Sequence, residues 1–320
     1  MKKSIILTMV LILCLPAAFA QEHFTIGIAQ FAVHGSLDNC REGFLQGLKD
    51  EGFVDGRNIT VLVQNAQADM GLAAQIASGF VDNGYDLIAA IATPMAVVSV
   101  NTADGKIPVV YSAVSDPVAA GLATADGLGE GPVTGTSDVL PVLKQIQTIR
   151  ALLPEAKTIG ILYTLAEVNS RVQLAEYQRL APEYGFAVES VGISQGADVA
   201  LALPGLVSKA DCLSMLLDNT VVQYLDVVLD ATDLKGIPVF GSEIEQVVRG
   251  CVASEGLDYL ALGIQTGKMA ARVLRGEDAA TIPFETISES ALYINSEKLA
   301  ELGIAVPEEL AARATDTAKK

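Results

Sequence analysis

The chain has 320 residues, of which 51% are hydrophobic and 5% aromatic, and its formal net charge is −17. This length and apolar content suit two ordinary domains with sizeable cores and exclude a disordered chain. So negative a protein is a poor partner for nucleic acid or for an anionic membrane surface.

The first twenty residues, MKKSIILTMVLILCLPAAFA, have the layout of a secretory signal peptide. Two lysines precede a short apolar run that ends in Ala-Phe-Ala, so we expect cleavage of residues 1–20 and a mature chain from about Gln21. Cys14 raises the alternative of a lipid anchor, but Leu13 stands where lipidation signals have a small residue. No later apolar run approaches the ~20 residues of a membrane span. The sequence therefore predicts a soluble protein exported to the periplasm or another extracytoplasmic space.

The first half of the mature chain alternates short apolar strands with amphipathic helices. We expect strands at 25–30, 59–64, 87–91 and 108–111, and helices at 37–51, 71–83 and 96–102. Continuous apolar runs of this length are typical of parallel strands covered on both faces. The fold class is therefore α/β, with a doubly wound parallel sheet.

The second half repeats the first. The segments that begin GIAQF at Gly27 and GILYT at Gly160 both end on Gly-Phe at the same internal distance. Farther along, YDLIAAIATP is echoed by ADCLSMLLDN, and IPVVYSAVSD by IPVFGSEIEQ. The repeat predicts two homologous parallel-sheet lobes with a ligand cleft between them.

Three segments are expected to connect the halves. GPVTGTSDVLPVLK carries the chain onward, SEGLDYLALGIQTGKMAARVLRGE predicts one more helix, and ETISESALYINSEKLAELGIAVPEEL predicts a strand and a final helix. Such appendages commonly cross between lobes and form a hinge. We expect lobe 1 to comprise 21–136 with about 258–286, and lobe 2 to comprise 137–257 with about 287–320.

The mature chain retains three cysteines, Cys40, Cys212 and Cys251. Their spacing is not that of a metal site, and the odd number excludes a fully paired framework. A bridge between Cys212 and Cys251 stays open, although buried thiols are favoured. His23 and His34 have no ligand constellation around them, so we expect neither a metal nor a cofactor.

Catalytic signatures are absent from the sequence. It contains no G-x-S-x-G elbow, no Walker A segment and no convincing G-x-G-x-x-G turn, and Ser112 has no identifiable base. We therefore predict no catalytic residues and favour binding over the alternative of a secreted hydrolase.

The binding residues are expected where the strands end, because ligands of doubly wound sheets bind beyond the carboxyl ends of the strands. In the first half, Ser112, Ser115 and Asp116 lie at a junction between a strand and a helix that favours a carboxylate. Asp116 before Pro117 has the equal alternative of a simple N-cap. The duplication pairs strand-end residues across the cleft: Gln30 with Tyr163, Thr93 with Asp218, and Ser112 with Ser242.

The second half offers more carboxylates than the first, which suits a zwitterion lying across the cleft. Asp218 and Asn219 are placed to meet an ammonium group, with helix capping as the alternative for Asp218. Phe31 and Tyr163 stand at strand ends where a ligand ring could be sandwiched, Phe31 being the better candidate. Further polar candidates follow the strands of this half: Glu167, Asn169, Ser170 and Glu243.

Several blocks together resemble the bacterial ABC-transporter substrate-binding proteins of the tryptophan/tyrosine-binding type. They include GIAQFAVHGSLD, YSAVSDPVAAGL, VTGTSD, EVNS, LDNT and the terminal YINSEKLAELGIAVPEEL, and the resemblance extends from about Phe24 to Leu310. It implies a type I periplasmic-binding-protein fold that closes on a small ligand and presents it to a membrane permease, as a monomer. It further implies that Thr93, Ser112 and Ser115 hold the ligand carboxylate, that Asp218, Asn219 and Glu167 lie near its amino group, and that Phe31 meets its side chain.

The chain departs from this family in the second lobe. YTLAEVNS has Thr-Leu-Ala where relatives often have Asn-Pro-Ser, and SEIEQ differs from their usual acidic pair. Side-chain specificity is therefore open. The sequence predicts the solute-binding component of an ABC importer for an aromatic or other apolar amino acid, with a ligand-sensing protein for a membrane receptor as the alternative.

Overall fold

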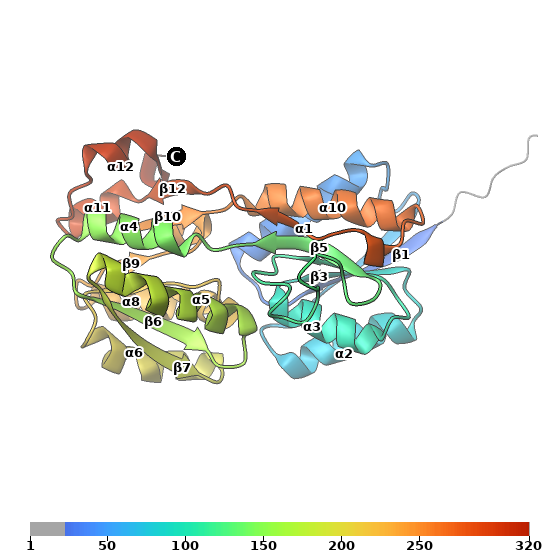
Figure 1. Cartoon of the computed structure of the whole chain (residues 1–320), viewed down its shortest axis with the longest axis horizontal. Helices are drawn as coiled ribbons and strands as arrows, with labels where there is room; N and C mark the ends of the chain where they lie inside the picture. The colour runs from blue at the N-terminus through green and yellow to red at the C-terminus, as the bar shows by residue number, and fades with distance from the viewer. Residues whose placement is uncertain (1–22, 320) are drawn as a thin grey trace, which may run out of the picture.

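The computed structural model describes residues 23–319, and the predicted signal peptide lies outside these residues. The chain forms two α/β lobes side by side, each built on its own sheet (Figure 1). The predicted fold class is confirmed. No helix of the described part is long and apolar enough to cross a membrane.

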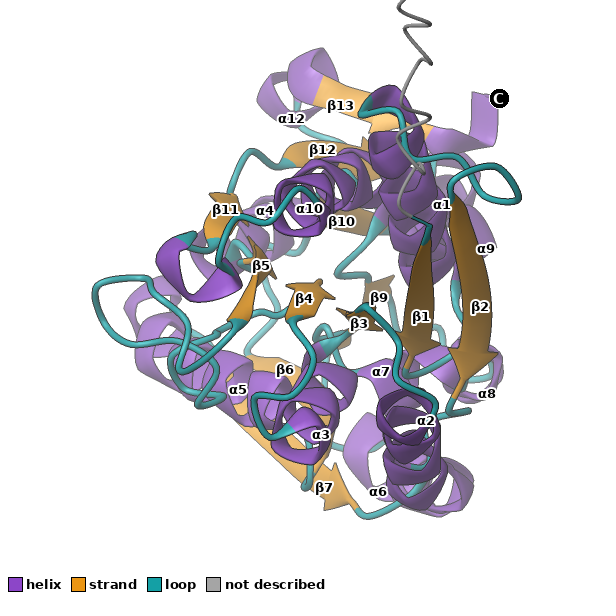
Figure 2. Ribbon diagram, turned by 90° about the vertical axis from the view of Figure 1, so that its right-hand side faces the viewer, coloured by secondary structure: helices purple, strands orange, loops and turns teal. Residues whose placement is uncertain are grey.

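The first lobe contains a six-stranded parallel sheet with the order β11-β5-β4-β3-β1-β2. Helices α1 and α10 cover one face of the sheet, and α2 and α3 cover the other (Figure 2). The strands are β1 (Phe24–Gln30), β2 (Ile59–Asn65), β3 (Leu87–Ile91), β4 (Val109–Ser112), β5 (Val133–Asp138) and β11 (Glu285–Ile287); the helices are α1 (Gly35–Asp50), α2 (Met70–Asp82), α3 (Thr93–Ala103) and α10 (Tyr259–Leu274).

The second lobe contains a seven-stranded sheet, β13-β12-β10-β9-β8-β6-β7, in which β10 and β12 are antiparallel. The run β7-β6-β8-β9 repeats β2-β1-β3-β4, as the sequence duplication predicts. The strands are β6 (Thr158–Thr164), β7 (Ala187–Ile193), β8 (Cys212–Ser214), β9 (Val239–Phe240), β10 (Ala253–Gly256), β12 (Ala291–Ile294) and β13 (Ala314–Asp316); the helices are α4 (Val142–Leu152), α5 (Val168–Leu180), α6 (Val199–Val207), α7 (Asn219–Gln223), α8 (Leu225–Asp233), α9 (Ile244–Arg249), α11 (Ser296–Glu301) and α12 (Glu308–Arg313).

The chain passes between the sheets three times, after β5, after β10 and after β11. The expectation of one strand and one helix at the C-terminal end is wrong, because β11 joins the first sheet while β12 and β13 join the second. Residue 303, a glycine at φ +68, and Pro307 divide the expected helix into α11 and α12. The segment predicted as one helix also begins with a strand, β10, which is buried throughout.

Helices α1 and α10 approach each other at glycines. A Cβ at Gly43 or Gly47 of α1 would lie 2.2 Å from a backbone oxygen of α10. Conversely, a Cβ at Gly263 or Gly267 of α10 would lie 2.1 or 2.3 Å from a backbone oxygen of α1. The backbones of the two helices therefore pack directly on each other. As a result α10, which follows most of the second lobe in the sequence, is fixed to the first lobe.

The three cysteines of the described chain are free and buried, which confirms the favoured interpretation over a bridge. Burial is the largest cause that raises the pKa of the Cys40 thiol to about 12. The thiols are therefore protonated, unreactive parts of the two cores.

Candidate functional site between the lobes

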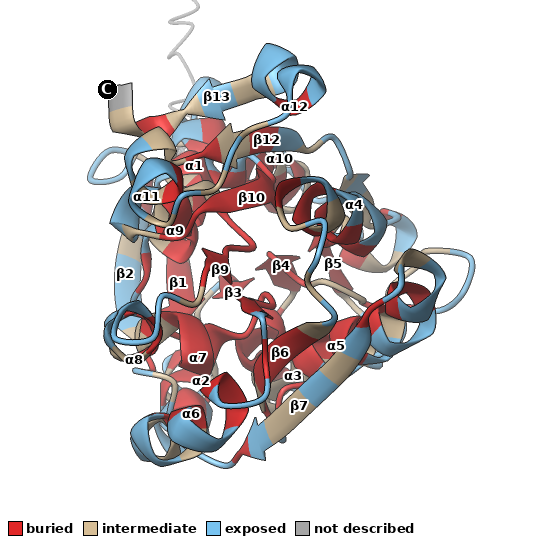
Figure 3. Cartoon of the chain, turned by 90° about the vertical axis from the view of Figure 1, so that its left-hand side faces the viewer, coloured by how far each residue is buried: buried red, intermediate tan, exposed pale blue. Residues whose placement is uncertain are grey.

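The carboxyl ends of the strands of the two sheets meet at a small cavity of about 10 Å³. The strands that end there, among them β3, β4 and β9, are buried in the middle of the molecule (Figure 3). The first lobe and the start of α10 contribute His34, Leu37, Thr93, Ala113, Ser115, Asp138 and Tyr259, and the second lobe contributes Asn169, Leu217, Asn219, Val222 and Glu243.

The wall from the first lobe has strained backbone at two alanines. Ala92 follows β3 with φ +83, and Ala113 follows β4 with φ +57. A residue with a Cβ pays roughly 1–2 kcal/mol for the left-handed region, and such strain clusters at functional sites. Ala92 also precedes α3 without a side-chain cap, so the positive end of this helix dipole lies beside Thr93 and would favour an anion there.

Several buried polar atoms of the cavity wall have no hydrogen-bond partner among the described residues. They are both ring nitrogens of His34, Oδ1 of Asp138 and Oδ1 of Asn169. Buried polar groups in native proteins are almost always paired, so their convergence on one cavity indicates the place of a polar ligand.

Asp138 connects the cavity to the hinge. It ends β5, where the chain first leaves the first lobe, and its Oδ2 accepts a 2.7 Å hydrogen bond from the hydroxyl of Tyr259, which begins α10. Burial, with a smaller contribution from the charge of Glu243, raises the pKa of Asp138 to about 7. None of the described residues that line the cavity is Lys or Arg, so a ligand ammonium group would supply the missing positive charge.

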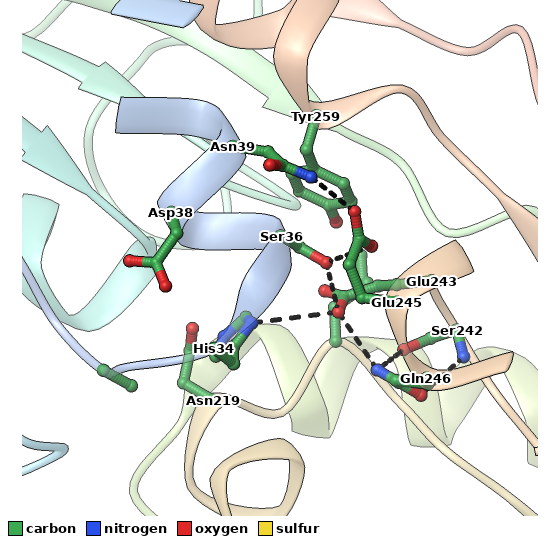
Figure 4. A network of polar contacts seen from close by, with 12 residues as sticks. His34, Ser36, Asp38, Asn39, Asn219, Ser242, Glu243, Glu245, Gln246 and Tyr259 are labelled. Carbon is green, nitrogen blue, oxygen red and sulfur yellow. Dashed lines mark hydrogen bonds and ion pairs between the residues drawn. The ribbon is translucent and has the colours of Figure 1, made fainter. Parts of the chain in front are cut away.

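Glu243 and His34 face each other across the interface, with 3.8 Å between His34 Nδ1 and Glu243 Oε2 (Figure 4). Burial and the neighbouring Glu245 raise the pKa of Glu243 to about 7. Burial lowers the pKa of His34 to about 4, against the opposing effects of the Asn219 amide and of nearby carboxylates. The imidazole is therefore neutral at neutral pH and presents one donor and one acceptor.

The wall from the second lobe is held by Glu167. Its carboxylate accepts hydrogen bonds from the backbone and side chain of both Asn219 and Thr220, at 2.7–3.0 Å, and from Nδ2 of Asn169 at 3.1 Å. Asn219 and Asn169 are thereby fixed before any ligand arrives, which lowers the entropy that binding must overcome.

Asp218 lies beside the cavity but does not line it. It caps α7 through Val221 N, and its oxygens also accept from the backbone and hydroxyl of Thr164 and from Ser170. Burial, together with the charge of Glu167, raises the pKa of Asp218. Its contacts support the alternative of helix capping over a direct contact with a ligand ammonium group, and they place Ser170 in the same internal network.

The remaining predicted residues line the cavity, line a neighbouring pocket or line neither. Phe31 and Glu167 line a neighbouring pocket between the lobes with a volume of about 320 Å³, while Tyr163 lines neither space. The cavity brings together Thr93, Ser115, Asn169, Asn219 and Glu243.

Four further predicted residues are occupied by contacts away from the cavity. Gln30 bonds to Asp38 and Arg41, Ser112 to Cys40, Thr136 and Thr266, and Ser242 to Leu216 and Gln246. Asp116 accepts from the backbone of Ala119 within a turn, because the helix predicted after Pro117 is absent and residues 117–120 form turns. The sequence places these residues at strand ends, but their side chains form hydrogen bonds within their own lobes instead of lining the cavity.

Three residues of the cavity were missed as site residues: His34, Asp138 and Tyr259. Asp138 ends the strand VTGTSD, so the strand-end rule applied to a fifth strand would have found it. Tyr259 directly follows Asp258, the N-cap of α10, and lacks a comparable signal. Within residues 23–319 no group of three or more His, Cys, Asp and Glu side chains is placed to hold a metal ion.

Comparison with known proteins assigns this architecture to a family. Residues 25–318 match the ABC transporter substrate binding protein family. A tyrosine-binding protein of Clostridioides difficile is 39% identical over 277 residues, which cover 87% of this chain and 80% of the relative.

Two solved structures each align with 92% of this chain and with 99% of their own chain. An ABC domain from Streptococcus pneumonia in complex with L-Trp has a TM-score of 0.89 at 33% identity. The ligand-free, open structure of a substrate-binding protein with adhesive properties from Clostridium difficile has a TM-score of 0.67 at 37% identity. The chain belongs to the ABC transporter substrate binding protein family, whose members bind solutes and are not enzymes.

Proposed function

We propose that this protein captures a zwitterionic amino acid with an aromatic side chain, tyrosine or tryptophan, outside the cytoplasm and delivers it to an ABC importer. The observation that carries the proposal is the set of unpartnered polar atoms on His34, Asp138 and Asn169 inside one enclosed cavity. The ligands named for the relatives from Clostridioides difficile and Streptococcus pneumonia support the aromatic class.

The cavity offers polar groups for both ends of an amino acid. The ligand carboxylate binds at Thr93 and the uncapped start of α3, where the helix dipole favours an anion. The ammonium group binds to the open oxygen of Asp138, and Asn169 offers a second acceptor. The apolar side chain packs on Leu37, Leu217 and Val222, which also line the cavity.

Capture occurs by closure about the hinge, with residues 24–138 and 259–287 moving as one body and residues 142–256 and 291–316 as the other. A ligand that contacts both walls favours the closed arrangement through its differential contacts there. The higher TM-score to the L-Trp complex than to the open, ligand-free protein, despite slightly lower identity, supports assigning this structure to the closed arrangement. The closed monomer then docks on a membrane permease.

The chain contains no tryptophan, so tryptophan itself is the probe. Titration of the mature, ligand-stripped protein with free tryptophan should give a saturable blue shift of indole emission. Tryptamine, which lacks the carboxylate, and indole-3-propionate, which lacks the ammonium group, should bind at least about tenfold more weakly, because each loses a charge-assisted contact. Thermal-shift measurements with tyrosine and the other amino acids then rank specificity. Absence of both emission shift and thermal stabilisation across the panel would refute the proposal.

A further inference from the structure

A cluster of polar side chains joins the lobes at the edge of the cavity (Figure 4). The hydroxyl of Ser36, on α1 of the first lobe, lies 2.6 Å from Glu243 Oε2 and 2.7 Å from Glu245 Oε2 of the second lobe. Nδ2 of Asn39, one turn along α1, donates to Glu245 Oε1 at 2.6 Å. We call Ser36, Asn39, Glu243 and Glu245 the interlobe latch.

The latch requires more protons than its side chains carry at neutral pH. A serine hydroxyl has one hydrogen to donate, and an ionised carboxylate only accepts. Ser36 can therefore donate to Glu243 or to Glu245, but not to both. A short contact with the second carboxyl group is a hydrogen bond only if that carboxyl is protonated and donates to the serine oxygen.

We infer that closing of the lobes takes up one proton from solvent, which is held by the chain of hydrogen bonds Glu243–Ser36–Glu245 and is released when the lobes open. Ser36, Asn39 and Glu245 do not line the ligand cavity, so they act on the ligand through closure. The inference rests on the hinge closure proposed above, but not on the identity of the ligand.

The surroundings of the latch favour this protonation. Gly35 leaves room for the second lobe, because a Cβ there would lie 2.7 Å from Cγ of Glu245. Ser36 and Glu243 are buried, and burial is the largest cause that raises the pKa of Glu243 from 4.5 to about 7. Closure is therefore favoured below pH 4.5, and this contribution is lost as the pH rises to about 7.

Other ionisable groups that face the latch also respond to pH. His34 acts in the opposite direction, because its pKa falls from 6.5 to about 4 on burial, so closing expels a proton from it within that range. Asp138, with its pKa raised to about 7, acts in the same direction as Glu243. Further titratable groups around the latch are Asp38, Glu167, Asp258, Tyr259 and Tyr293. Glu245→Gln and Glu245→Ala both remove the charge that acts on His34 and Glu243, so a comparison of these two variants keeps that effect constant.

Two substitutions of Glu245 separate protonation from mere contact. In Glu245→Gln the amide donates permanently to Ser36, as the protonated acid does, while its oxygen still accepts from Asn39. In Glu245→Ala both contacts are lost. Glu309, exposed on α12, provides the matched control, Glu309→Gln, which removes the same charge away from the latch.

The measurement is the interlobe distance distribution in full-length mature protein without ligand. Nitroxide labels on Gln75→Cys of α2 and Ala200→Cys of α6 report it by double electron–electron resonance, because both positions are exposed and the native thiols are buried. Since no ligand is present, the result does not depend on whether an amino acid binds. Failure of the carrier hypothesis and failure of the latch are therefore distinguishable.

At pH 5.5 wild type and Glu245→Gln should have the same ratio of closed to open molecules. At pH 8 the ratio for Glu245→Gln should be at least about tenfold higher than for wild type, since one pKa unit of coupling corresponds to a tenfold change. Glu245→Ala should open the protein at both pH values, and Glu309→Gln should match wild type. The inference is overturned if Glu245→Gln follows wild type at every pH, or opens the protein as Glu245→Ala does.

Discussion

The two lobes use corresponding positions in opposite ways. In the second lobe the helix after β8 begins at Asp218, whose carboxylate caps that helix and binds Thr164 and Ser170. In the first lobe the helix after β3 begins at Ala92, which has no capping side chain and adopts φ +83. The same helix start is capped by a side chain of its own lobe in one half and has no side-chain cap in the other.

This difference shows that a carboxylate at a strand end is not by itself a ligand contact. Asp218 and Glu167 have their oxygens occupied within the second lobe, so they stiffen its wall. Asp138 keeps one oxygen unpartnered at the cavity. Whether a buried carboxylate is open to the cavity therefore depends on the hydrogen-bond donors that its own lobe supplies.

The largest expected effect is on the stability of the second lobe. Asp218→Ala leaves buried donors of Thr164, Ser170 and Val221 without an acceptor, and each such loss costs about 1–3 kcal/mol. We expect a loss of about 3 kcal/mol or more in the free energy of unfolding, measured by urea denaturation. Asp116→Ala, which removes one hydrogen bond from an exposed turn of the first lobe, should cost only about 1 kcal/mol. Equal losses would break the contrast between the lobes.

The next effect is on ligand binding. Asp138→Asn removes the negative charge from the cavity while keeping the size of the side chain, and hydrogen bonds to charged groups contribute about 1.5–3 kcal/mol. The affinity for tryptophan should fall about 10- to 100-fold, as measured by calorimetry. Asp116→Asn, whose side-chain oxygen can still accept from Ala119, should bind as wild type does. Unchanged affinity of Asp138→Asn would remove the first lobe from recognition of the ammonium group.

The smallest effect tests the strained backbone of the first lobe. Ala113→Gly relieves a left-handed residue at φ +57, and the greater flexibility of glycine in the unfolded chain offsets part of the gain. The ligand-free protein should be stabilised by about 1 kcal/mol or less, visible as a small rise in melting temperature. The same change at Ala166, which lies at a strand end of the second lobe without a left-handed φ, should destabilise. A fall in melting temperature for Ala113→Gly would mean that this alanine is not strained.

Most of the fold could be predicted from the sequence, because the patterns that mark its strands and helices are local. Apolar runs such as 87–91 become buried strands, and the internal repeat reappears as a repeated strand order. The C-terminal end was harder to predict from the sequence, because β11, β12 and β13 are short and join different sheets. Which sheet a three-residue strand joins depends on tertiary packing, which local propensity does not encode.

Part of the candidate site could be predicted from the sequence. Thr93, Ser115, Asn169, Asn219 and Glu243 reach the cavity because strand ends of parallel sheets converge there. Ser112 stands at a strand end too, but its hydroxyl turns toward Cys40 and Thr266 beneath α10. Position along a strand was predictable, whereas the direction of a side chain depends on partners distant in sequence. Asp138 was missed because its segment was interpreted as a connection between halves.

The glycine contact between α1 and α10 also constrains the order in which the parts of the protein can fold. A chain made from its N-terminus completes 24–138 long before residues 259–274 exist, yet α1 has no other helix that fits Gly43 and Gly47 so closely among the described elements. The core of the first lobe therefore stays open on one face until nearly all of the second lobe has been synthesised.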